Sequence, residues 1–95
     1  NGRNRITYDY MATRGTINMA LTRVAEFFRP AIIANAASVI ISHNHPSGEA
    51  EPSPEDIFFT KELVKAGDLL EIVVLDHVIV GKDTFVSLKD RGLGF

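Results

Sequence analysis

The chain has 95 residues, 45% of them hydrophobic, and carries a formal net charge of −2. This length suits one small domain with a core of its own. The absence of Cys excludes disulfides and thiolate metal sites. No apolar run approaches the ~20 residues of a membrane span, and no signal peptide is recognisable, so we expect a cytoplasmic domain without membrane contact. The acidic balance argues against direct nucleic-acid binding, which needs clustered Lys and Arg.

The N-terminal third is predicted to hold a strand and then a helix. Apolar and polar side chains alternate over residues 5–13, which is typical of a strand with one buried face, and Gly15 suits a bulge or turn. Thr22 can cap a helix that carries a broad apolar stripe. Pro30 should kink this helix or split it, and Asn35 suits its end.

An apolar run over residues 36–42 predicts a buried strand that leads into His43-Asn44-His45-Pro46. Strand side chains alternate between faces, so His43 and His45 should project to one side and Asn44 to the other. Pro46 cannot donate a ladder hydrogen bond, so the strand should end there. The two imidazoles are either an ordinary polar strand end or half of a metal site.

The segment Ser53-Pro54-Glu55-Asp56 is typical of a helix start, with Ser53 as N-cap and Pro54 at the first helical position. We expect this helix to continue to about Leu70. If it begins beside the end of the preceding strand, Asp56 in its first turn can be a third ligand. Two His and one carboxylate, with a fourth position open to water, suit a catalytic zinc.

A second long apolar strand is predicted over residues 72–80. Its only polar residues, Asp76 and His77, should face opposite sides. They are either a strand end or hydrogen-bonded core residues, or one of them is an outer partner that orients a metal-binding histidine.

The C-terminal residues are predicted to form a hairpin and a tail. A turn at residues 81–83 should pair the strand at 84–88 with the one before it, and residues 91–95 are interpreted as a frayed tail. The strands and helices together predict an α/β (α+β) fold: a single three-layer domain with a mixed β-sheet flanked by two main helices.

The motif His-x-His-Pro, then six residues, then Ser-x-x-Asp resembles the JAMM (MPN-plus) metallopeptidase motif. Flanking runs extend the likeness to nearly the whole chain, which resembles the RadC family at residues 15–18, 35–41 and 75–81. The resemblance implies a JAB/MPN (cytidine-deaminase-like) architecture. It also implies a Zn²⁺ site and an oxyanion-stabilising serine, which fall here on the ligands His43, His45 and Asp56 and on the catalytic residue Ser53.

The function implied by this resemblance is that of a zinc-dependent metallopeptidase or isopeptidase-like hydrolase acting on a peptide or protein substrate. The family's general base is a glutamate, which we expect upstream of Asn1 in a longer parent. The chain would then be a C-terminal fragment without its first strand, and the strand edge left open would favour a homodimer. Glu26, on a helix face, is interpreted as a solvated or salt-bridging residue.

Other functions fit parts of the pattern. The main alternative is a non-catalytic JAMM-like binding module in a DNA-repair or mobile-element protein, the process that the RadC label implies. A structural zinc site would need four protein ligands. The adjacent letters His-Asn-His do not indicate an HNH nuclease, whose residues need not be adjacent, and a cupin would lack the two helices. An enzyme requires the upstream glutamate and an open metal position, and a binding module requires neither.

Overall fold

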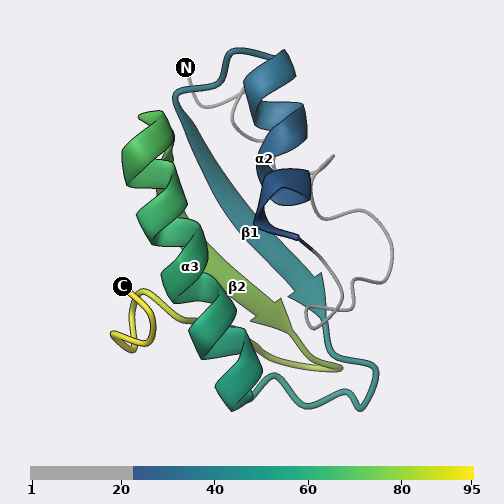
Figure 1. Ribbon diagram of the computed structural model, residues 1–95. Coiled ribbons are helices and arrows are strands. Elements are labelled where there is room, and N and C mark those ends of the chain that lie inside the picture. The colour runs from purple at the N-terminus through teal and green to yellow at the C-terminus, as the bar shows by residue number, and fades with distance from the viewer. Residues whose placement is uncertain (1–22) are drawn as a thin grey trace.

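The computed structural model describes residues 23–95; the strand and bulge predicted at 5–13 and Gly15, and the cap Thr22, lie outside this range. The described elements are, in chain order, α2 Val24–Ile33, β1 Ser38–Asn44, α3 Pro54–Leu70, β2 Val73–Val80 and β3 Phe85–Ser87 (Figure 1). The strands form one sheet in the order β1-β2-β3, with β1 and β2 parallel and β2 and β3 antiparallel. The α+β class with a mixed sheet is confirmed.

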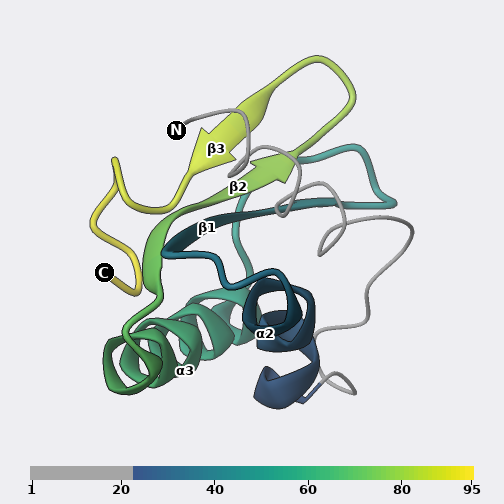
Figure 2. The same cartoon turned by 90° about the horizontal axis from the view of Figure 1, so that it is seen from above.

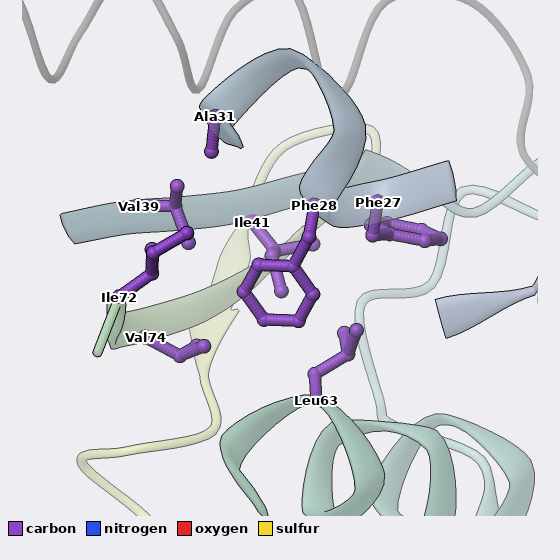
Figure 3. Packing of buried hydrophobic residues seen from close by; sticks show 8 residues of the cluster. All are labelled: Phe27, Phe28, Ala31, Val39, Ile41, Leu63, Ile72 and Val74. Carbon is purple, nitrogen blue, oxygen red and sulfur yellow. The ribbon is translucent and has the colours of Figure 1, made fainter. Parts of the chain in front are cut away.

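Both described helices pack on the same face of this sheet (Figures 1 and 2). The main core lies between them and the sheet, with Phe28 near its centre (Figure 3). Side chains from α2, β1, α3 and the start of β2 build it: Phe27, Phe28, Ala31, Val39, Ile41, Leu63, Ile72 and Val74. Within residues 23–95 the arrangement therefore has two layers. The prediction of a three-layer domain placed the sheet between the two helices, whereas both helices lie on one face of it.

The side chains of β1 alternate strictly between buried and partly exposed. Val39, Ile41 and His43 are buried, while Asn44 is exposed. His43 thus lies on the face that packs against the helices, in line with the core residues that precede it. The predicted alternation is confirmed through His43 and Asn44, and His45 lies one residue past the end of the strand.

A β-bulge in β2 changes the side-chain alternation of that strand. Val39 is paired with Val74, but the next residue of β1, Ile40, is paired with Asp76, so Leu75 is an extra residue. After this bulge His77 is buried and Asp76 is only partly buried. The bulge therefore turns the imidazole, and not the carboxylate, toward the helices.

Helix α2 departs from prediction at its start, and of the two outcomes predicted at Pro30, a kink or a split, the split does not occur. It begins at Val24, with Arg23 at the N-cap position and no capping bond from the Arg23 side chain. It also runs through Pro30 without being split, and the Pro30 carbonyl accepts the N–H of Ala34 at 3.0 Å. Asn35 follows the helix end with a φ of 57°, as its predicted role requires.

Helix α3 has the predicted bounds and begins at the predicted cap, Ser53. It ends at Glu71, which adopts a left-handed conformation with a φ of 62°. Gly67 is a buried residue in the interior of this helix. A Cβ there would lie 2.4 Å from the carbonyl oxygen of Ile72, so the close approach of the β2 segment requires glycine.

The interpretation of residues 91–95 as a frayed tail is wrong. The Arg91 guanidinium donates to both carboxylate oxygens of Glu51 at 3.0 and 2.9 Å. The Leu93 N–H donates to the Leu88 carbonyl at 2.9 Å, and Leu93 packs against the smaller buried cluster that contains Leu88. Long-range packing, which local polarity does not reveal, holds this segment against the domain.

Candidate metal centre

The three predicted ligands meet where the C-terminal end of β1 faces the N-terminus of α3. One ligand atom from each of His43, His45 and Asp56 can be chosen so that all lie within 4.8 Å of one another. The Nε2 atom of His45 is 3.0 Å from Asp56 Oδ2, and that of His43 is 3.7 Å from Asp56 Oδ1. Asp56 follows His45 by 11 positions and His43 by 13 in the sequence. The strand, the loop and the helix cap bring the three side chains together.

The helix cap orients the Asp56 carboxylate. Asp56 Oδ2 accepts the Ser53 N–H at 2.8 Å, while Ser53 Oγ accepts the Asp56 N–H at 3.1 Å, which completes a capping box. Burial by itself raises the pKa of Asp56, but the Ser53 hydrogen bonds and the neighbouring imidazoles outweigh it and hold the pKa below its ordinary value of 3.8. Asp56 is therefore an ionised carboxylate at neutral pH, the form that binds metals.

A backbone carbonyl fixes the tautomer of His45. The Nδ1 atom lies 2.8 Å from the carbonyl oxygen of Glu49. Because a carbonyl oxygen can only accept, Nδ1 must carry the hydrogen, and in the neutral ring Nε2 has the lone pair. That lone pair faces Asp56 Oδ2 across 3.0 Å.

The facing lone pairs provide a test of whether the residues fit a cation. Two acceptors 3.0 Å apart repel each other unless a proton or a metal ion lies between or beside them. A divalent cation bound by both atoms would remove this repulsion and would match the ligand types of a zinc site. The donor set therefore fits a metal ion.

His77 lies directly behind His43. Its Nε2 atom is 3.1 Å from His43 Nδ1, and its Nδ1 atom is 2.6 Å from the hydroxyl of Thr60 on α3. Burial lowers the pKa of His77 to about 4, with the neighbouring His43 adding to the effect. Burial also lowers the pKa of His43, and the charge of Asp56 partly opposes it. Both rings are therefore neutral at pH 7.

The family of the chain follows from comparison with known proteins. The model of the RadC-like JAB domain matches residues 1–93. The chain belongs to the RadC-like JAB domain family.

Three curated relatives, each called a UPF0758 protein, illustrate the similarity. The Chloroflexus aggregans protein is 56% identical over 81 residues, which cover 85% of this chain and 35% of the relative.

The other two relatives are more distant but match more of the chain. The Roseiflexus castenholzii protein is 46% identical over 93 residues, which cover 98% of this chain and 40% of the relative. The Methanosarcina barkeri protein is 44% identical over 90 residues, which cover 95% of this chain and 39% of the relative. This RadC-like domain thus spans about two-fifths of the length of the relatives it matches.

Asp76 and Glu26, which the sequence analysis also considered, lie outside the group of candidate metal ligands in this RadC-like domain. Asp76 accepts hydrogen bonds from the Ser87 hydroxyl at 2.6 Å and from the N–H groups of His77 and Lys89 at 2.7 and 3.2 Å. It therefore fastens β2 to β3 and to the segment that follows. Glu26 is exposed on α2, as interpreted from the sequence.

Thr60 is the residue that sequence reasoning missed. Thr60 follows Asp56 by four residues, so it lies one helical turn further along the same side of α3. This spacing was the one feature of the sequence that could have indicated a role for Thr60 near the site. Thr60 is fully buried, and its hydroxyl donates to the Asp56 carbonyl at 2.6 Å.

No helix among residues 23–95 is long and apolar enough to cross a membrane.

Proposed function

We propose that this RadC-like domain is the metal-binding part of a zinc-dependent hydrolase that cleaves peptide or isopeptide bonds. The observation that carries the proposal is the convergence of His43 Nε2 and His45 Nε2 on the ionised carboxylate of Asp56. The conclusion also rests on the membership of the chain in the RadC-like JAB domain family.

Zinc is the metal proposed because two imidazole nitrogens and one carboxylate oxygen suit it. Three protein ligands leave a position for water or substrate, as catalytic zinc sites do. When bound, zinc supplies Lewis-acid chemistry, which activates water and polarises a substrate carbonyl.

The residues around the ligands would position the substrate and stabilise charge. Ser53 Oγ accepts the Asp56 N–H, so the hydroxyl hydrogen remains able to donate to another acceptor. Ser53 would donate that hydrogen to the oxyanion that forms on the attacked carbonyl. The Glu49 carbonyl would hold the His45 ring in its binding orientation throughout. The proton acceptor would be the glutamate expected upstream of Asn1.

One observation favours a second function, a non-catalytic JAMM-like binding module. In the part of the chain that the structure describes, Asp56 is the one carboxylate in the group of candidate ligands, and as a ligand it would not be free to accept a proton. Such a module would bind the metal and a protein partner without proton transfer.

Metal analysis of the purified chain tests the site itself. We expect about one zinc per chain in the wild type and its loss in His45→Ala and Asp56→Ala. Glu49→Ala is the matched control, because it removes an exposed carboxylate beside the site but keeps the backbone carbonyl that holds His45. Failure of the folded wild type to take up zinc, even when zinc is supplied, would overturn the proposal.

Peptide hydrolysis by a longer protein that contains this domain and the expected upstream glutamate would separate the two functions. A hydrolase should lose activity when the upstream glutamate is changed to glutamine, while its zinc content stays constant. Zinc binding without hydrolysis of any peptide or isopeptide substrate would instead favour the binding module.

A further inference from the structure

We propose that Thr60 and His77 form a hydrogen-bond relay that determines which nitrogen of His43 carries the hydrogen, so that both are positioning residues for the metal ligand. The relay runs from the Asp56 carbonyl through the Thr60 hydroxyl and the His77 ring to His43. This inference rests on the proposed function, because it concerns the form in which His43 is presented to a metal.

The direction of the relay follows from counting hydrogens at Thr60. Its Oγ1 atom lies 2.6 Å from the Asp56 carbonyl oxygen and 2.6 Å from His77 Nδ1. Each of these short contacts needs a hydrogen between its two atoms. The carbonyl has none, so the single hydroxyl hydrogen must point to it. The second hydrogen must then come from His77 Nδ1.

The same count continues from His77 to His43. A neutral imidazole with its hydrogen on Nδ1 has a lone pair on Nε2. That lone pair lies 3.1 Å from His43 Nδ1, which must therefore donate. His43 is left with its own lone pair on Nε2, the nitrogen that faces Asp56 Oδ1 at 3.7 Å. The relay thus selects the tautomer that can bind a metal.

Burial makes this selection effective. Thr60 and His77 are 0% exposed and His43 is 6% exposed, so water has little access to replace a lost partner. Buried polar atoms that lose their partner are costly, which favours one arrangement of hydrogens over the others. Asp56 contributes at both ends, since its backbone carbonyl starts the relay and its side chain lies beside His43 Nε2.

If the relay ran in the opposite direction, the site would be blocked. A hydrogen on His77 Nε2 would donate to His43 Nδ1, and the neutral His43 would then carry its hydrogen on Nε2. That hydrogen would point toward Asp56 and occupy the lone pair needed for metal binding. Removal of the Thr60 hydroxyl should allow this arrangement, because His77 Nδ1 would no longer have its acceptor.

The test uses the whole chain with Thr60→Val, which removes the hydroxyl at nearly constant shape, and Thr60→Ser, which restores it. Long-range ¹H–¹⁵N correlation spectra of the metal-free chain at pH 8 report the tautomer of each histidine ring. We expect the His43 hydrogen on Nδ1 in the wild type and in Thr60→Ser, and a mixture or a shift to Nε2 in Thr60→Val. Unchanged His43 signals in folded Thr60→Val would overturn the relay.

Zinc affinity gives a second readout. Outer partners of metal-binding histidines contribute about 10- to 100-fold in affinity, so we expect a loss of that size in Thr60→Val and recovery in Thr60→Ser. Equal zinc affinity in all three proteins would overturn the positioning role while the proposed metal site stands. Conversely, a wild type that binds no zinc would defeat the proposed function, and the spectra of the metal-free chain would still decide the relay.

Discussion

Asp56 and Ser53 hydrogen-bond to each other in both directions, and the Asp56 oxygen that accepts the Ser53 N–H also lies 3.0 Å from His45 Nε2. The start of helix α3 therefore also forms one wall of the candidate metal site. A ligand held by a helix cap loses little rotamer freedom when a metal binds, because the cap has already fixed it.

Asp56→Asn should separate capping from metal binding. The amide oxygen can still accept the Ser53 N–H, so the metal-free variant should unfold within about 0.5 kcal/mol of the wild type, whereas Asp56→Ala should lose about 1 kcal/mol. Both variants should lose zinc affinity by more than ~100-fold, since a ligand contributes more than its outer partners. Urea unfolding and zinc titration measure the two effects. Tight zinc binding by Asp56→Asn would show that the carboxylate is not a ligand.

Ser53 has a structural role and a proposed catalytic role, which two substitutions can distinguish. Ser53→Ala removes a capping acceptor and should cost about 1 kcal/mol of unfolding free energy, while Ser53→Gly should cost only a few tenths. Both lack the hydroxyl, so both should lower kcat of the proposed hydrolase by about 100-fold. If Ser53→Gly kept full kcat, the serine would be a cap and nothing more.

Acid should destabilise the metal-free domain between pH 6.5 and about 4. The unfolded chain takes up a proton at His77 near its ordinary pKa of 6.5, but in the folded chain the ring stays neutral until its pKa of about 4 is reached. Stability therefore falls as the pH drops through this window, by about 3 kcal/mol at about 1.4 kcal/mol per pH unit.

Other groups act in the same direction. The lowered pKa of His43 adds to the loss in the same range, and the lowered pKa of Asp56 adds a further loss when its carboxylate is protonated below pH 3.8. Urea unfolding in the presence of a chelator at pH 8, 6 and 4.5 measures the effect. A flat unfolding free energy from pH 7 to 4.5 would contradict the buried neutral imidazole.

Gly81→Ala should weaken metal binding from outside the cluster. A Cβ there would lie 2.5 Å from the Gly48 carbonyl oxygen and 2.9 Å from the Ala50 nitrogen, so the loop on either side of Glu49 must move. We expect a stability loss of about 1–3 kcal/mol and a measurable fall in zinc affinity, because the Glu49 carbonyl orients His45.

The control for this prediction is Gly92→Ala. Gly92 has a φ of +68°, so alanine is strained there, but a Cβ would meet nothing within 4 Å. Gly92→Ala should therefore lower stability and leave zinc affinity unchanged. Equal zinc affinities in the two variants would show that the loop does not hold the ligand.

The parts of the site that could be predicted are those governed by local rules. The alternation of a strand places His43 and His45 on one side, and a Ser-Pro-x-Asp cap places Asp56 in the first turn of α3. Each rule involves only neighbouring residues, so the sequence carries it in full. The junction of β1 and α3 then required only that the two elements meet, which the RadC resemblance implied.

The remaining features depend on contacts between distant residues. The bulge at Leu75 arises from the pairing of β2 with β1, and the contact of Thr60 with His77 requires α3 to lie over β2. The placement of both helices on one face is likewise a property of packing. Periodicity in one segment holds no information about the register of another, so these features could not be derived from the residues alone.

The single extra residue at Leu75 also has a consequence for the formal charge of the metal centre. Without the bulge, the alternation of β2 would turn Asp76 toward His43 in place of His77. A carboxylate behind a ligand histidine makes that ligand more electron-rich and adds a negative charge to the centre. With a neutral ring there, Asp56 would be the one anionic ligand among residues 23–95, and a divalent ion would retain a net positive charge. One unpaired residue in a strand would thereby keep the ion a stronger electrophile.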